Sequence, residues 1–190
     1  MDKAFCPACG IHVEIIHMTV GVGVAAEEVP RCVNCGFVLS TETPDSRKVM
    51  YQRVAIAEDQ EPVRSAVRDA LVQHRMAAVV DEFEDGGKLI QAIQAFAGQG
   101  RIYDLVVLDL NMPVINGLQA ANFLRALEKQ KGWADTPILF FSAMLCDAKL
   151  RQQIQTLAPS SYLNKGTIGS REQLPERLSR VLMAYPVSQL

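Results

Sequence analysis

Residues 105–118, LVVLDLNMPVINGL, contain the segment that decides the fold. An apolar, strand-like run occupies residues 105–110 and carries one aspartate, Asp109, near its end. Beyond this run a second apolar pattern recurs at helical spacing, at Ala120, Ala121, Leu124 and Leu127. A strand followed by an amphipathic helix is the repeating unit of a parallel sheet, because parallel strands need long crossover connections.

The same alternation extends over residues 49–190. The apolar runs lie at residues 53–57, 76–80, 105–110, 137–141 and 161–163. Each is followed by a segment of helical periodicity, and Pro62 suits the first turn of the first helix. This pattern predicts an α/β fold with a five-stranded parallel sheet, doubly wound, so that helices cover both faces.

Length and composition allow one ordinary domain and a small extra module. The chain has 190 residues, 49% of them hydrophobic, and a net charge of -2. A polar stretch with a proline, STETPDSRK, separates two apolar parts. We therefore predict a cysteine-rich module at residues 1–40, a linker at 41–48 and the α/β domain at 49–190. Neither a secretory signal nor a run of roughly 20 apolar residues is present, so we expect a cytoplasmic protein without a membrane partner.

Polar residues close four of the predicted strands, at the edge where open α/β sheets bind ligands. They are Glu58 and Asp59, Asp109, Ser142 and Lys165. Two carboxylates about 5 Å apart repel by roughly 3 kcal/mol at an effective dielectric near 20, so a cation is expected among them. Mg²⁺ prefers oxygen ligands and shares waters with phosphate, and an aspartate can accept a phosphoryl group. Taken singly, each acid has a plainer alternative as a helix cap.

These residues resemble the receiver domain of bacterial response regulators, the phosphoacceptors of two-component signalling, over about residues 49–185. That family ends its first strand with an acidic pair, as VAIAEDQEPVR does with Glu58 and Asp59. Its acceptor aspartate is followed by a proline and a glycine. The other matches are Pro113 and Gly117 after Asp109, Ser142 before Ala143, and Tyr162 three residues before Lys165. The resemblance implies the flavodoxin-like receiver fold.

The resemblance also implies a role for each matched residue. Asp109 would accept the phosphoryl group, and Ser142 and Lys165 would hold phosphoryl oxygens. Tyr162 would swing inward when Ser142 moves, which makes a two-state switch. The implied Mg²⁺ ligands are Glu58, mainly through water, Asp59, Asp109 and the carbonyl of Asn111. One departure is Gly166, because many receivers place a proline after the lysine.

The predicted function is that of a response regulator, which is a phosphoacceptor and not an enzyme with a separate substrate. The donor would be a histidine kinase or a phosphotransfer protein, and the output would pass to a downstream protein through contacts. Relatives communicate, and some form homodimers, through a face that lies here at about residues 146–184. Two alternatives stay open: an adaptor that is never phosphorylated, and a phosphatase-type enzyme. Asn111 argues against the phosphatase, which needs a second aspartate at that position.

The cysteine-rich module contains two C-x-x-C-G knuckles. They are Cys6-Pro-Ala-Cys9-Gly and Cys32-Val-Asn-Cys35-Gly. Four thiolates in such turns suit a tetrahedral Zn²⁺, and a structural zinc would hold together a module too small to fold alone. IHVEIIHMTVGVGV alternates like a hairpin strand and GFVLS would add another, which predicts a small β zinc ribbon. A rubredoxin-like iron centre and disulfides are the alternatives.

Charge argues against a nucleic-acid partner for the ribbon, although many zinc ribbons have one. Residues 1–48 contain four basic and six acidic side chains, which gives -2 before the thiolates are counted. A phosphate backbone would be repelled by this charge. We therefore expect a protein-contact or architectural role for the ribbon, with nucleic-acid binding as the alternative.

Overall fold

The computed structural model of the protein describes residues 3–20, 27–39, 50–96, 98–100, 103–166 and 173–183. A small antiparallel sheet and a larger parallel sheet lie within these residues. The predicted linker at 41–48 falls outside them, as does most of the loop after Gly166. None of the helices in the described ranges is long and apolar enough to span a bilayer.

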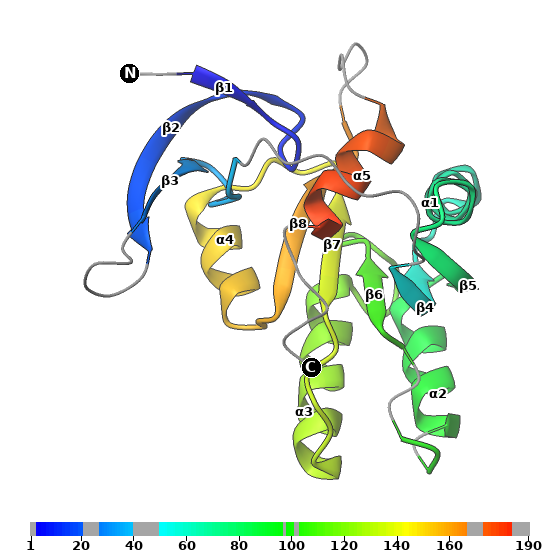
Figure 1. The fold of residues 1–190 in the computed structure, drawn as a ribbon. Helices are drawn as coiled ribbons and strands as arrows, with labels where there is room; N and C mark the ends of the chain where they lie inside the picture. Colours follow the sequence, from blue (N-terminus) through cyan, green and yellow to red (C-terminus); the bar gives the residue numbers. More distant parts are fainter. Residues whose placement is uncertain are drawn as a thin grey trace.

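The large sheet has five parallel strands in the order β5-β4-β6-β7-β8 (Figure 1). Their bounds are β4 (Tyr51–Ala57), β5 (Ala77–Phe83), β6 (Leu105–Leu108), β7 (Ile138–Ser142) and β8 (Ser160–Asn164). The strand that follows β4 in the chain lies on one side of it, and the later strands lie on the other. This change of direction places a ligand-binding crevice beyond the carboxyl ends of β4 and β6.

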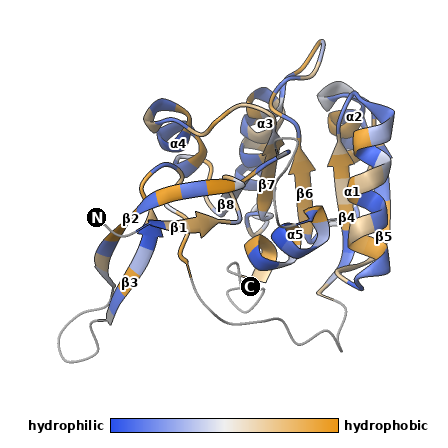
Figure 2. Cartoon of the chain, turned by 90° about the horizontal axis from the view of Figure 1, so that it is seen from above, coloured by the Kyte–Doolittle hydropathy of each residue, from blue (hydrophilic) through white to orange (hydrophobic). Residues whose placement is uncertain are grey.

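Helices cover both faces of this sheet. They are α1 (Glu61–Gln73), α2 (Gly86–Phe96), α3 (Gly117–Lys131), α4 (Ala148–Gln155) and α5 (Leu174–Met183). Helices α1 and α5 share one hydrophobic core, to which Leu71 and Leu178 belong. Helices α2, α3 and α4 share the other, to which Leu124 and Ile154 belong. Figure 2 shows β6 and β7 in the colours of hydrophobic residues between these layers, which confirms the predicted doubly wound fold.

Local signals fix several helix ends. The Asn116 side chain caps α3 by accepting from the backbone of Gln119, whose side chain accepts in return from Asn116. Helix α3 ends at Lys131, and Gly132 caps it with a φ of 67°. The Asp147 side chain caps α4 by accepting from the Leu150 N–H at 2.7 Å. Cys146 lies just before this cap and outside α4.

Strand β5 differs most from its predicted bounds, because it continues to Phe83 through two acidic residues. It is an edge strand, so its side chains can reach solvent and charged partners. Asp81 accepts from Arg53 Nε at 2.6 Å, and Glu82 accepts from Arg68 Nη1 at 2.8 Å. These pairs explain why charge does not end the strand there.

Residues 3–20 and 27–39 contain a three-stranded antiparallel sheet, β1-β2-β3. Its strands are β1 (Lys3–Cys6), β2 (Ile11–Val20) and β3 (Glu27–Cys32). This confirms the predicted β ribbon with one correction. Within the described residues, the segment after Cys35 makes an isolated bridge between Val38 and Arg31 and not a strand.

The ribbon shares a hydrophobic core with the α/β domain. Cys6, Cys9 and Cys32 belong to the same hydrophobic core as helices α1 and α5. In Figure 1 the ribbon lies beside α4 and above the end of β8. The two predicted modules are therefore joined by shared packing as well as by the chain.

Candidate functional site

The ends of neighbouring strands assemble the predicted rim. Glu58 follows β4, and its backbone N–H donates to the carbonyl of Phe83 in β5. Asp109 follows β6, and its N–H donates to the carbonyl of Ala57 at 2.9 Å. The other members are Ser142, the last residue of β7, and Lys165, which follows β8. The sheet's own hydrogen bonds thus fix the backbone positions of the acidic residues.

Lys165 lies between two buried carboxylates. Its Nζ is 2.7 Å from Glu58 Oε2 and 3.1 Å from Asp109 Oδ2. The side chains of Glu58 and Asp109 are 1% and 3% exposed, and that of Lys165 is 14% exposed. Little water screens these pairs, so the ammonium directly offsets the negative charge that the two acids concentrate at the rim.

Burial at the rim changes the protonation of Glu58. Burial raises the pKa of the Glu58 carboxyl above its ordinary value; the hydrogen bond from Lys165 opposes the rise, and the charge of Asp109 adds to it. The carboxyl therefore takes up a proton more readily than a free glutamate does. A cation bound beside it would favour the ionised form instead.

Three carboxylates lie close enough to hold one metal ion. One oxygen each from Glu58, Asp59 and Asp109 lies within 4.8 Å of the other two. Asp59 is exposed whereas its neighbours are buried, so the cluster opens to solvent on one side. Oxygen ligands with an open side fit Mg²⁺, which usually retains several waters. Asn111 lies exposed in the loop after β6, and its part in metal binding stays a prediction.

Gly117 explains the spacing of the motif after Asp109. A Cβ at this position would lie 2.2 Å from the backbone oxygen of Asp109. Only glycine permits this approach between the start of α3 and the loop that carries the acid. The glycine that the sequence motif contains therefore positions the backbone of Asp109.

The predicted switch residues lie at the ends of β7 and β8. Ser142 is buried, and its Oγ accepts from the Met144 N–H at 3.3 Å. The Tyr162 ring is buried too, and its hydroxyl donates to the Met144 carbonyl. Burial raises the pKa of Tyr162 above its ordinary range, so the hydroxyl stays protonated and can donate. Tyr162 thus lies in the inward position, and its movement stays a prediction.

Asn164 belongs to this network although no sequence pattern identifies it. Its Nδ2 donates to the Met144 carbonyl at 2.8 Å and to the Tyr162 hydroxyl at 2.9 Å. Its Oδ1 accepts from the N–H of Gly166, which has a φ of 97°. The one available signal was its place directly before Lys165. The positive φ also accounts for glycine at the position where many receivers have proline.

The four predicted cysteine ligands converge on one point. The Sγ atoms of Cys6 and Cys35 are 3.6 Å apart, and those of Cys9 and Cys32 are 3.7 Å apart. Tetrahedral Zn²⁺ with bonds of about 2.3 Å requires Sγ separations of about 3.8 Å. The thiols are free, and these separations match a shared metal and not disulfides of about 2.05 Å.

The two knuckles have the same backbone geometry. Gly10 and Gly36 donate to the carbonyls of Cys6 and Cys32 at 2.8 and 2.9 Å. Their φ angles are 73° and 78°, in the left-handed region that favours glycine. Cys9 and Cys35 each point an N–H at the first sulfur of their own knuckle. Such repeated turns fit a tetrathiolate metal site, and the donors suit zinc or iron.

Comparison with known proteins identifies the larger part of the chain. A family profile described as the response regulator receiver domain matches residues 54–178. The two-component response regulator ORR41 of Oryza sativa subsp. japonica is 37% identical over 75 residues, which are 40% of this chain and 57% of that protein. The peroxide stress-activated histidine kinase mak3 of Schizosaccharomyces pombe is 28% identical over 118 residues, 62% of this chain and 5% of the kinase. The chain thus spans less than two thirds of either relative.

Solved structures agree with the profile. The signal receiver domain of NarL from Mycobacterium tuberculosis has a TM-score of 0.54 and 29% identity, and the match covers 72% of this chain and 94% of that one. The receiver domain of the histidine kinase CKI1 from Arabidopsis thaliana, complexed with Mg²⁺ and BeF3⁻, shares the fold, with a TM-score of 0.60, 17% identity, and coverage of 73% and 91%. Because the profile covers more than half of its residues, the chain belongs to the response regulator receiver family.

Proposed function

We propose that the protein is a two-component response regulator that accepts a phosphoryl group on Asp109 in a Mg²⁺-dependent reaction. The donor would be a histidine kinase or a phosphotransfer protein. One observation carries the proposal: Lys165 Nζ lies 2.7 Å from Glu58 and 3.1 Å from Asp109 at a rim where a third carboxylate is within reach. An acceptor, an ammonium and a set of oxygen ligands are the components that phosphoryl transfer to an aspartate needs.

In this reaction a carboxylate oxygen of Asp109 attacks phosphorus, a new P–O bond forms, and the bond to the donor nitrogen breaks. Bound Mg²⁺ would neutralise charge on the transferred oxygens. Lys165 would exchange one carboxylate partner for a phosphoryl oxygen with little movement, since it already touches Asp109. The Ser142 hydroxyl, at the end of the adjacent strand, would donate to another oxygen.

The signal would leave the site through the segment after β7. A shift of Ser142 towards a phosphoryl group would pull on Met144, whose N–H it accepts. The Met144 carbonyl is in turn held by Tyr162 and by Asn164. Phosphate contacts made in one state only can bias such a network by their differential binding free energy. The output would be a protein contact near this segment.

Mass spectrometry of the intact protein tests the proposal. With acetyl phosphate and Mg²⁺, the wild-type protein should gain the mass of one phosphoryl group, and Asp109→Asn should gain none. Asp135→Asn is the matched control. Asp135 is exposed in the loop before β7, at the amino ends of the strands, whereas Asp109 lies at their carboxyl ends. A folded wild-type protein whose mass does not change, or an Asp109→Asn variant that gains the same mass, would refute the proposal.

A further inference from the structure

The ribbon docks on the receiver through arginine side chains that reach into both cysteine knuckles. Arg177 of α5 is 1% exposed, and its Nε donates to the Pro7 carbonyl at 2.8 Å. Pro7 lies between the predicted metal ligands Cys6 and Cys9. The first knuckle thus accepts a hydrogen bond from the buried guanidinium group of Arg177.

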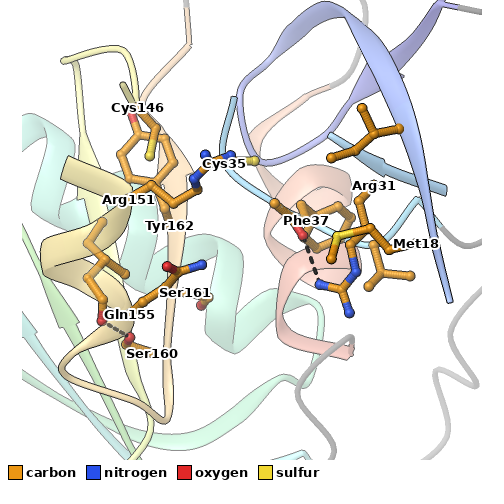
Figure 3. A pocket seen from close by; sticks show the side chains of 14 residues that line it. Met18, Arg31, Cys35, Phe37, Cys146, Arg151, Gln155, Ser160, Ser161 and Tyr162 are labelled. Carbon is orange, nitrogen blue, oxygen red and sulfur yellow. Dashed lines mark hydrogen bonds between the residues drawn. The ribbon is translucent and has the colours of Figure 1, made fainter. Parts of the chain in front are cut away.

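The second knuckle receives an equivalent contact from another helix. Arg151 of α4 donates from Nη1 to the Val33 carbonyl at 2.7 Å. Val33 lies between Cys32 and Cys35, as Pro7 lies between the ligands of the first knuckle. Figure 3 shows Arg151 beside Cys35, with Tyr162 and Cys146 on the same wall of the groove between ribbon and receiver. Two guanidinium groups also complement the negative charge of a tetrathiolate site.

Asn164 joins the first knuckle to the phosphoryl site. Its N–H donates to the Ala8 carbonyl at 2.6 Å, and its carbonyl accepts from Arg177 Nη2 at 2.8 Å. Its side chain holds Tyr162 and Met144, and the next residue is Lys165. One residue therefore touches the metal-binding loop, the tyrosine of the proposed switch and the ammonium-bearing end of β8.

We propose that the ribbon is the receiver's intramolecular partner, so that metal binding by the four cysteines and phosphoryl-group binding at Asp109 strengthen each other through Asn164. The inference rests on the proposed function. We expect the coupling to be positive. With the ribbon docked, Asn164 donates to the hydroxyl of an inward Tyr162, and the inward position is the one expected of the phosphorylated state. Linkage is reciprocal, so occupancy of Asp109 should raise the affinity for the metal by the coupling factor. At an unchanged association rate, the dissociation rate of the metal falls by the same factor.

The test measures zinc release and not signalling. Zinc-loaded protein is mixed with an excess of a zinc-selective chelator, in Mg²⁺ alone or in Mg²⁺ with BeF3⁻, the phosphoryl analogue bound in the CKI1 structure. We expect BeF3⁻ to slow release by at least about fivefold, the lower end of typical allosteric couplings. An unchanged or faster release, with BeF3⁻ shown by fluorine NMR to be bound, overturns the inference. Failure of BeF3⁻ to bind would instead count against the proposed function.

Two glycine variants locate the coupling. A Cβ on Gly10 would lie 2.7 Å from Arg177 Nη2, whereas one on Gly36 would meet its nearest atom, in Arg151, at 3.8 Å. Both glycines have φ near 75°, so both alanine variants carry the same backbone strain. Gly10→Ala should bring the ratio of release rates with and without BeF3⁻ close to one, and Gly36→Ala should keep the wild-type ratio. Equal ratios in the two variants would contradict the assignment to the first knuckle.

Discussion

Gly117→Ala should slow phosphorylation of Asp109 while leaving its chemistry intact. The new Cβ would lie 2.2 Å from the Asp109 backbone oxygen, and real Cβ atoms essentially never approach such an atom within 3.0 Å. The start of α3 and the Asp109 backbone must therefore separate by at least about 0.8 Å, the difference between these values. A displacement of about 1 Å can lower a rate on the order of 100-fold, because the attacking oxygen loses its alignment.

The rate of phosphorylation by acetyl phosphate, followed by intact mass, measures this effect. Overpacking of this kind also costs about 1–3 kcal/mol of stability, which urea unfolding would record separately. Gly98→Ala is the control, since a Cβ there meets no atom within 4 Å. If folded Gly117→Ala accepted the phosphoryl group as fast as Gly98→Ala, the claim that Gly117 positions Asp109 would be wrong.

Three further predictions concern stability. Arg177→Met should lower the free energy of unfolding in urea by about 3–6 kcal/mol, because the buried Pro7 and Asn164 carbonyls lose charged donors worth about 1.5–3 kcal/mol each; the exposed Lys149→Met should change it little. Glu58→Gln should raise the thermal stability of the metal-free protein near pH 7. The pKa of Glu58 is raised in the folded protein, so ionising this carboxyl destabilises the fold as the pH rises through that pKa, and glutamine does not ionise. Between about pH 4 and about pH 8, the melting temperature of this variant should depend less on pH than that of the wild-type protein. A variant that is less stable than the wild-type protein at neutral pH would contradict the assignment. Removal of zinc by a chelator should lower the melting temperature of the whole chain, since three of the cysteines belong to the receiver core; an unchanged receiver transition would show that the ribbon is energetically separate.

The rim and the knuckles could be predicted because local patterns determine them. Periodicity placed Ala121 and Leu124 on a buried helix face, and the rule for strand ends predicted that Glu58, Asp109 and Lys165 lie near one another. A cysteine spacing that suits one tetrahedral ion needs no knowledge of the rest of the fold. Each pattern can be read within one strand, turn or helix, and the parallel sheet and the antiparallel ribbon then bring the separate segments together.

What the sequence could not predict depends on contacts between distant segments. Arg177 is an ordinary helical arginine in the sequence, yet Pro7, its partner, lies 170 positions away. Charges at Asp81 and Glu82 hid the end of β5, since their partners come from another strand and from α1. Asn164 gains its importance only when the ribbon, β8 and the tyrosine meet.

The shared packing of ribbon and sheet bears on how this protein can be dissected. A truncation at the polar segment near residue 45, which domain parsing would suggest, would remove Cys6, Cys9 and Cys32 from a hydrophobic core that they share with α1 and α5. It would also remove the Pro7 carbonyl that accepts a hydrogen bond from the buried Arg177 guanidinium group. An isolated receiver half would therefore lack part of its hydrophobic core, and its phosphorylation kinetics would not describe the intact protein. Grafting this receiver onto another output module requires that the first 39 residues travel with it.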